Sequence, residues 1–453
     1  MVSTCSIFKS PHFARMLLHL AQLFTSRSES LINVLMNALK EKSRELDAAD
    51  QLKRFRDEFH IPLQDGKPQI YLVGNSLGLQ PKRTRDFVMQ ELDSWQNLGV
   101  RGHFSGDFPW MPYHEFLTET MADIVGARND EVVMMNSLTT NLHLMMATFY
   151  RPTKERFKIL IEAHSFPSDS QAAESQISFH GFDPASGLVT VGGDANSPIS
   201  TASIVDAIEQ HKSELALVLL PGVQYYTGQV FDISTIVAAA HKYEIPVGFD
   251  LAHAVGNVEL QLHDWDVDFA VWCSYKYLNS GPGSVGGCFI HQRHANDTQK
   301  VRLAGWWGHD KTTRFEMKNE FQPIPTAEGW QLSNPPILSM AAIRASLDVF
   351  RECGMARLLE KSKLMTQFLE DCLLEMVGNI VEIITPEQRG CQLSLTLNPE
   401  SLTGKEVHAR LESSRVEADW REPNAIRIAP VPLYNSFDDC YQFAEILQQC
   451  STD

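Results

Sequence analysis

The sequence has no excess of basic charge and no long apolar run. Its 453 residues include 39 lysines and arginines against 56 aspartates and glutamates, which gives a net charge of −17 at pH 7. This balance argues against a protein whose main partner is nucleic acid or an anionic membrane. No uninterrupted apolar run reaches the length that spans a bilayer, so we expect no membrane segment. An anionic ligand must therefore be held by local donors rather than by the overall field of the protein.

Paired cysteines and metal-binding motifs are also missing. The eight cysteines form no C-x-x-C pair, and several lie within apolar runs, which favours free buried thiols and a reducing compartment. The sixteen histidines include no H-E-x-x-H motif and no convincing ligand spacing, so we predict no metal site. Residues 281–286 match G-x-G-x-x-G, but a strand-like run follows where a dinucleotide site needs a helix. This favours a simple turn.

The first 28 residues contain no acidic side chain. Lys9, Arg15 and Arg27 lie among serines and leucines, a composition compatible with a mitochondrial transit peptide. An N-terminal extension without a targeting role explains the same residues and is slightly favoured. We therefore expect a cytoplasmic protein, with mitochondrial targeting by residues 1–28 as the alternative.

Apolar runs of strand length alternate with amphipathic, helical segments between residues 70 and 290. Four of these runs read as buried strands, at 157–162, 215–220, 245–249 and 269–273. Buried strands separated by helices predict a mainly parallel sheet with helices on both faces. After residues 334–336 the pattern changes to two long helices, two strands and a last helix. These are expected at 338–352, 355–377, 391–397, 425–429 and 437–450.

The pattern as a whole predicts an α/β protein with two domains. The larger domain has a mainly parallel, helix-flanked sheet, and a smaller α+β domain follows it at the C-terminus. We place an N-terminal extension at 1–45, the large domain with an N-terminal helical arm at 46–335, and the small domain at 336–453. A cleft between two domains is a common setting for a small-molecule site.

Two strand ends carry the residues of greatest chemical interest. Asp250 closes the run that begins at Val247, and Lys276 follows the run that ends at Cys273. Open α/β sheets bind ligands at the carboxyl ends of their strands, so both side chains would face one cleft. A carboxylate that keeps a pyridine nitrogen protonated and an amine that forms an imine suit pyridoxal 5′-phosphate. Such a pair alone is usually two solvated charges, but His253 and the tyrosines on either side of Lys276 make the combination much rarer.

The surroundings of Lys276 resemble the aspartate-aminotransferase-like superfamily of pyridoxal phosphate enzymes. The wider pattern resembles the kynureninase family. The motifs that carry this narrower resemblance are GNSLGLQP (74–81), FDLAHAVGN (249–257), WCSYKYLN (272–279), GWWGH (305–309), SNPP (333–336) and RIAPVPLYNS (427–436). They occur in the right order and at similar spacing between about residues 50 and 450. Together they are far more specific than any single match.

The resemblance implies a role for each matching position. Lys276 would form the Schiff base with pyridoxal phosphate, Asp250 would pair with the pyridine nitrogen, and His253 would lie near the ring. Tyr226 is a candidate for a catalytic tyrosine near the phosphate. The other implied cofactor-binding residues are Leu138, Thr139, Phe166, Pro167, Ser168, Asp169, Tyr275, Trp306 and Asn334. The implied substrate-binding residues are Ser76, His103, Asn334 and Arg427, of which Arg427 would clamp the α-carboxylate with its planar fork of donors.

One position departs from the family pattern. Pro221 stands where the family has a serine before Gly-Val, and proline has neither an N–H nor a hydroxyl to donate. We expect one phosphate contact to be lost or replaced, with Thr227 as a candidate replacement.

The activity that the resemblance implies is hydrolytic cleavage of the Cβ–Cγ bond of L-kynurenine or 3-hydroxy-L-kynurenine. The products would be L-alanine plus anthranilate or 3-hydroxyanthranilate. This reaction belongs to tryptophan catabolism by the kynurenine pathway and to pyridine nucleotide biosynthesis. The family also implies a homodimer, in which the phosphate site borrows groups from the partner.

Two other functions stay open at this point. A class V aminotransferase or a cysteine desulfurase would share the lysine environment, and a desulfurase needs an exposed cysteine of low pKa on a mobile loop. Cys391 lies in about the right region, but residues 392–397 read as a buried strand, which weakens this alternative. A non-catalytic binding protein of the same fold would not require the full set of reactive residues named above.

Overall fold

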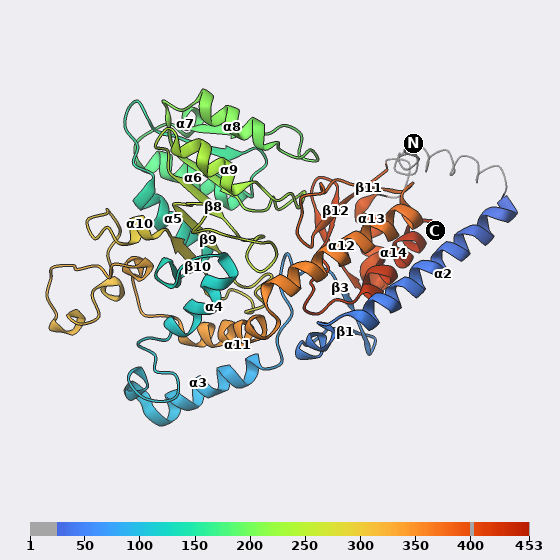
Figure 1. Ribbon diagram of the computed structural model, residues 1–453, viewed down its shortest axis with the longest axis horizontal. Helices are drawn as coiled ribbons and strands as arrows, with labels where there is room; N and C mark the ends of the chain where they lie inside the picture. Colours follow the sequence, from blue (N-terminus) through green and yellow to red (C-terminus); the bar gives the residue numbers. More distant parts are fainter. Residues whose placement is uncertain (1–24, 399–402, 453) are drawn as a thin grey trace, which may run out of the picture.

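The computed structural model describes residues 25–398 and 403–452 (Figure 1). Most of the candidate targeting segment, residues 1–24, lies outside this part of the chain. Within the described residues, no helix is long and apolar enough to cross a membrane.

A seven-stranded sheet forms the centre of the larger unit, in the order β4-β10-β9-β8-β7-β5-β6. Its strands are β4 (Val132–Met134), β5 (Lys158–Glu162), β6 (Leu188–Val191), β7 (Leu215–Pro221), β8 (Val247–Asp250), β9 (Phe269–Trp272) and β10 (Gly287–Ile290). The pairs from β6 to β9 are parallel, and β10 runs antiparallel to both of its neighbours. The predicted mainly parallel sheet is confirmed. A strand also follows the glycine-rich turn at 281–286, as we expected.

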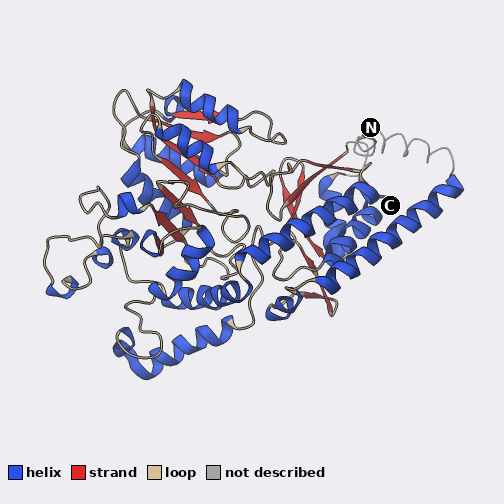
Figure 2. Ribbon diagram, in the orientation of Figure 1, coloured by secondary structure: helices blue, strands red, loops and turns tan. Residues whose placement is uncertain are grey.

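Helices cover both faces of this sheet (Figures 1 and 2). The helices of the larger unit are α3 (Thr84–Leu98), α4 (Glu115–Val125), α5 (Leu138–Phe149), α6 (Pro167–Phe179), α7 (Pro184–Gly187), α8 (Thr201–Gln210), α9 (Ile233–His241), α10 (Gln292–Ala295) and α11 (Ile337–Cys353). Successive residues of β7 point to opposite faces. Val218 and Leu220 pack with α4, α8, α9 and α11, whereas Leu217 and Leu219 pack with α5 and α6. Both faces are apolar, which explains the unbroken apolar strands.

A four-stranded antiparallel sheet forms the smaller unit, in the order β11-β12-β15-β14. Its strands are β11 (Val381–Ile383), β12 (Leu393–Leu397), β14 (Asp419–Arg421) and β15 (Ala425–Ile428). The helices α2 (Thr25–Ala49), α12 (Met355–Val377), α13 (Gly404–Ser413) and α14 (Phe437–Thr452) pack in this unit (Figure 1). The strands and helices predicted after residue 336 correspond to α11, α12, β12, β15 and α14. The α/β fold class with a smaller α+β unit is thus confirmed.

Short segments connect the two units. The strands β1 (Leu63–Gln64) and β2 (Lys67–Pro68) form a hairpin, and β3 (Ile70–Tyr71) pairs in parallel with β13 (Val416–Glu417) of the smaller unit. Buried residues of α11 belong to the core of the larger unit, and those of α14 to the core of the smaller unit. The helix α12 contributes to both, with Leu358 in the larger core and the residues from Met365 onward in the smaller one. The exact domain boundaries at 45/46 and 335/336 stay a prediction.

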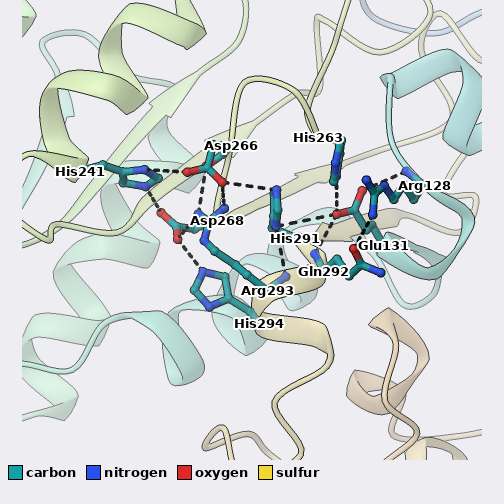
Figure 3. A network of polar contacts seen from close by, with 10 residues as sticks. All are labelled: Arg128, Glu131, His241, His263, Asp266, Asp268, His291, Gln292, Arg293 and His294. Carbon is teal, nitrogen blue, oxygen red and sulfur yellow. Dashed lines mark hydrogen bonds and ion pairs between the residues drawn. The ribbon is translucent and has the colours of Figure 1, made fainter.

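Two buried carboxylates anchor the edge of the large sheet at which β4, β8 and β9 begin (Figure 3). Asp268 accepts hydrogen bonds from His241 Nε2 at 2.9 Å, His294 Nε2 at 2.6 Å and the Val247 N–H at 2.7 Å, and it pairs with Arg293 at 2.7 Å. Burial by itself would raise the pKa of the Asp268 carboxyl. The hydrogen bonds from the two histidines and the charge of Arg293 outweigh burial and hold this pKa well below its usual range.

The second carboxylate, Glu131, is equally well satisfied. It accepts from His263 Nδ1 at 2.8 Å, from the Gln292 N–H at 2.7 Å and from the Arg128 N–H at 2.9 Å. Its contacts with His263 and His291 bring three ligand-type groups close together, but backbone N–H groups already occupy the Glu131 oxygens. We therefore interpret this group as a structural network that ties the strand ends together.

Replacing Asp268 with asparagine is expected to destabilise the protein by about 3–5 kcal/mol, the cost of breaking a buried ion pair by removing one partner. Because the pKa of Asp268 is depressed in the folded state, its stabilisation is present at neutral pH and is lost as the pH falls below the ordinary aspartate range. Urea unfolding at several pH values measures both effects. Wild-type stability would fall on acidification more steeply than that of the variant, and an equal pH dependence would contradict the prediction.

Candidate active site

A cavity of about 310 Å³ opens at the carboxyl ends of β5, β7, β8 and β9. One wall comes from the large sheet and the loops that follow its strands. The opposite wall comes from β14 and β15 of the smaller unit. This is the edge at which open α/β sheets bind ligands, and it lies opposite the edge held by Asp268 and Glu131.

Lys276 and His253 meet inside this cavity. Lys276 follows β9, and its Nζ lies 3.0 Å from Nε2 of His253, which follows β8. Burial, followed by the positive charges of Lys276, Arg427 and Arg421, holds the pKa of His253 well below its usual range. The imidazole is therefore neutral at pH 7 and can accept a hydrogen bond from the lysine.

The backbone around Lys276 is fixed by a close approach of another loop. The Gly78 N–H donates to the Tyr275 carbonyl at 2.8 Å, and any side chain at Gly78 would overlap the Lys276 carbonyl. Tyr275 also lines the cavity, as predicted for a cofactor-binding residue. Only glycine allows this contact, which explains the position of Gly78 in the GNSLGLQP motif.

Three carboxyl groups gather at the base of the cavity. Asp250 ends β8 and accepts a hydrogen bond from the Ala252 N–H at 2.7 Å, and its side chain is also hydrogen-bonded to Asp169. Glu162 ends β5 and is buried beside them. Burial and the proximity of Asp250 raise the pKa values of Asp169 and Glu162 well above their usual range. Burial raises the pKa of Asp250 as well, but the Ala252 N–H, the charge of Lys276 and the hydrogen bond with Asp169 counteract burial there. We therefore place the proton on Asp169, with Asp250 as the carboxylate that accepts from it.

The starts of α5 and α6 supply hydroxyl groups and an aromatic ring. Thr139 Oγ1 and Ser168 Oγ lie 2.9 Å apart, and both residues line the cavity together with Leu138. Pro167 is the first residue of α6, and Phe166 directly before it places its ring edge-on to Tyr225 at 5.3 Å between centroids. The uncapped N–H groups at the start of α5 add anion-binding capacity.

Arg427 lies on the opposite wall with its guanidinium almost fully buried. Its Nε donates to Asp419 Oδ2 at 2.7 Å, its Nη2 donates to the same oxygen, and its Nη1 donates to the Tyr225 carbonyl at 2.6 Å. Burial lowers the pKa of Arg427 to about 10, so the group stays charged at neutral pH. Ser76, another predicted substrate-binding residue, also lines this cavity.

Pro167 lies between two cavity residues without lining the cavity itself, and four further predicted site residues lie outside the cavity of the single chain. The Tyr226 side chain is buried next to the backbone of Asn424. Trp306 donates to the Arg314 carbonyl at 3.1 Å, and His103 contacts the Val100 carbonyl at 3.0 Å. The fourth, Asn334, lines a separate cavity next to Ser137 and Gly283.

Several cavity residues were not predicted from the sequence. They include Asn75, Glu162, Val223, Tyr225, Ala252 and Arg421. Pro221, which departs from the family pattern, also lines the cavity. Glu162 ends an apolar strand as Asp250 does, so the same strand-end criterion could have identified it. Arg421 could be found only from its pairing with β15.

The donor set fits pyridoxal phosphate. Lys276 offers an amine for the aldehyde, Asp250 a carboxylate for the pyridine nitrogen, and Phe166 an aromatic ring in the cavity wall. The hydroxyls of Thr139 and Ser168 at a helix start suit a phosphate group.

The chain is similar to known proteins along most of its length. Residues 358–447 match the family model described as the kynureninase C-terminal domain. A protein named kynureninase from Koribacter versatilis (strain Ellin345) is 53% identical over 408 residues, covering 88% of this chain and 95% of that protein. One of the same name from Xanthomonas oryzae pv. oryzae (strain PXO99A) is 54% identical over 402 residues, with the same coverage.

Solved structures share the fold at low sequence identity. A cysteine desulfurase from Escherichia coli has a TM-score of 0.70 at 14% identity, covering 88% of this chain and 98% of that one. A C-DES mutant with glycine covalently linked to its PLP cofactor has a TM-score of 0.69 at 15% identity, covering 84% of this chain and 96% of that one. At such identities these structures support the fold alone.

Proposed function

Because the chain belongs to the kynureninase family, we propose that the residues of the described cavity carry out the hydrolysis for which the family is named. The protein is a pyridoxal phosphate-dependent hydrolase that cleaves the Cβ–Cγ bond of kynurenine. The bond to the γ-carbonyl breaks, the hydroxyl of water goes to Cγ to give the aromatic acid, and a proton goes to Cβ to give alanine. The observation that carries the residue assignment is the contact of Lys276 with a neutral His253 in a cavity that also holds Asp250 and Arg427.

Lys276 would hold the cofactor covalently, and Asp250 would pair with its pyridine nitrogen. Thr139 and Ser168 would bind the phosphate, with Phe166 against the ring. When bound, pyridoxal phosphate supplies an electron-withdrawing ring that stabilises negative charge developing on the substrate carbons. Asp169 supports this arrangement because its proton leaves Asp250 as the charged member of the pair.

Lys276 also moves protons. Its Nζ lies at the strand end that faces the cavity, and His253 at 3.0 Å orients it. Because the imidazole is neutral and buried, it accepts from the lysine without competing as an acid. Lys276 Nζ would take the proton from the substrate Cα, because a positioned amine is suited to general base catalysis.

Arg427 would bind the substrate α-carboxylate, and Ser76, which lines the same cavity, would contact the aromatic end of the substrate. Asp419 fixes the guanidinium through its Nε and Nη2 edge, so the remaining N–H groups keep one orientation. A planar, pre-oriented donor of this kind selects an amino acid and aligns its Cα with Lys276.

We also propose that the protein forms a homodimer, because an aromatic surface is exposed on the single chain. Phe104, Trp306 and Phe315 are 65%, 43% and 54% exposed, and Phe315 contacts the rings of the other two. Exposed apolar patches of this kind mark interaction sites. A second copy on this surface would cover the rings and bring His103, Trp306 and Asn334 to the partner's cavity, although they lie outside their own.

Incubation of the purified holoenzyme with L-kynurenine and with its 3-hydroxy form tests the function. We expect equal amounts of L-alanine and the aromatic acid to accumulate with at least one of them. Sedimentation equilibrium tests the dimer and would give twice the chain mass of 51.0 kDa. Substrate consumption without alanine would contradict the proposed function, and a monomer of full activity would contradict the dimer.

The desulfurase alternative is not supported by the relatives, and the structure gives a direct test of it. Cys391 is fully buried, and burial raises the pKa of its thiol to about 12. Replacing Cys391 with alanine should therefore leave the turnover of kynurenine within about twofold, because the thiolate required of a nucleophile is absent at neutral pH. Sulfide release from cysteine, if lost in this variant while present in the wild type, would contradict the prediction.

A further inference from the structure

Arg421 places a second guanidinium group in the cavity wall beside Arg427. Both residues line the cavity, and both lie on neighbouring antiparallel strands, β14 and β15. The register sets Asp419 opposite Arg427, and Arg421 opposite Ala425. Because alternate residues of a strand share a face, Asp419 and Arg421 point to the same side. The small side chain of Ala425 leaves the Arg421 side uncrowded.

Most of the N–H donors of Arg427 are already hydrogen-bonded within the protein. Three of the five N–H donors of its guanidinium are used, two by Asp419 and one by the Tyr225 carbonyl, and the side chain is 1% exposed. Two N–H donors remain for a ligand. Arg427 therefore acts as a fixed anchor with limited free capacity.

Arg421 has the opposite character. Its side chain is 36% exposed, and its Nε lies 3.2 Å from Asp419 Oδ2. Among residues 25–398 and 403–452, no hydrogen bond engages its two terminal nitrogens. Asp419 thus supplies one negative charge to two guanidinium groups, and the cluster keeps a net positive charge. One further carboxylate would balance it.

The positive charge of Arg421 affects the pKa of His253, the residue that contacts Lys276. After burial, Lys276 and Arg427, it is Arg421 that lowers the pKa of His253, and it acts in the same direction on Tyr225. This agrees with a guanidinium directed into the cavity rather than into solvent. The substrate brings one carboxylate into this space, on the carbon that Lys276 deprotonates.

We propose that Arg421 is a second substrate-binding residue, which binds the α-carboxylate jointly with Arg427 while Asp419 holds the two guanidinium groups apart. A carboxylate has two oxygens with about four acceptor positions, so it can accept from both arginines at once. The two residues have different tasks. Arg427 fixes the position of the carboxylate, and Arg421 adds charge and a movable donor. This inference rests on the proposed function, because it assumes an amino-acid substrate in this cavity.

The test compares two ligands that differ only in their carboxylate. L-alanine, a product of the proposed reaction, and its amide are titrated into the holoenzyme, and binding is read from the change in cofactor absorbance. Arg421→Gln should weaken L-alanine about 10- to 100-fold, the contribution of a hydrogen bond to a charged group, and alaninamide less than twofold. Arg421→Lys should be intermediate, because it keeps the charge and loses the fork. Arg357→Gln is the matched control, because the Arg357 side chain is hydrogen-bonded to the Glu352 carbonyl and does not line the cavity.

Each other outcome overturns the inference. Equal weakening of both ligands would mean a structural role for Arg421. A lower affinity for pyridoxal phosphate in Arg421→Gln would assign the residue to the phosphate, and unchanged binding of L-alanine would show that Arg427 acts alone. A wild-type protein without a cofactor band or without alanine binding would overturn the proposed function together with this inference, whereas the first three outcomes leave the function standing.

Discussion

Replacing Lys276 with alanine is expected to lower the turnover of kynurenine by at least about 10⁴-fold, the upper end of what a positioned proton-transfer group contributes. The substitution removes both the covalent attachment of the cofactor and the amine that takes the Cα proton. It leaves the cavity intact, because the loop is held by the Gly78 contact with the Tyr275 carbonyl and not by the lysine side chain. Pyridoxal phosphate should still bind, without the absorbance band of the lysine-bound form.

Turnover, the absorbance spectrum and the thermal midpoint are measured together for this variant. Lys212→Ala serves as the control, since Lys212 is an exposed lysine outside the cavity whose Nζ lies 3.9 Å from Glu209 and 4.9 Å from the centre of the Tyr243 ring. The control should match the wild type in all three. A Lys276→Ala protein that kept more than about 1% of the wild-type turnover would fall far outside the range for loss of such a group and would remove Lys276 from the mechanism.

Replacing Asp250 with asparagine should lower turnover by about 10²- to 10³-fold, the usual cost of losing one preorganised electrostatic contact in an active site. Asparagine keeps the shape of the side chain and its contact with the Ala252 N–H, but it removes the charge that faces the pyridine nitrogen. The same change removes a fully buried charge, and burial raises the pKa of Asp250 itself. The cofactor-free protein should therefore become more stable as the holoenzyme becomes less active.

This prediction is specific because turnover should fall while the stability of the cofactor-free protein should rise. Turnover of the holoenzyme and urea unfolding of the cofactor-free protein supply the two readouts. Asp268→Asn is the matched control, because the same substitution at the other edge of the sheet should destabilise the protein. Unfolding curves that show Asp250→Asn to be as unstable as Asp268→Asn would mean that Asp250 is a structural residue.

The sequence predicted the parts of the site that depend on position along one strand. Asp250, His253 and Lys276 follow buried strands, and parallel strands bring their carboxyl ends to one edge. Glu162 obeys the same rule and was overlooked, because its run was interpreted only as a strand. The register of β14 with β15 depends on packing between distant segments, so the place of Arg421 beside Arg427 could not be predicted.

A different limit applies to the residues that lie outside the cavity. The resemblance implied roles for His103, Trp306 and Asn334, but a match in sequence does not show whether a residue serves the site of its own chain or that of a partner. Our dimer proposal assigns them to the partner's cavity. Tyr226 stays a prediction, because its side chain is buried near Asn424, whereas Tyr225 and Tyr275 line the cavity.

The antiparallel strand β10 gives the two walls of the cavity different mechanical properties. Lys276 lies on the connection between β9 and β10, which are hydrogen-bonded neighbours, so both ends of its loop are clamped to the same sheet. Arg421 and Arg427 lie on a separate four-stranded sheet that belongs to another core. If the cavity opens to admit a substrate, we therefore expect the wall with the two arginines to move relative to Lys276. The arginines would hold the substrate by its α-carboxylate, so closure of that wall would bring the Cα–H bond to the amine of Lys276, which keeps its position.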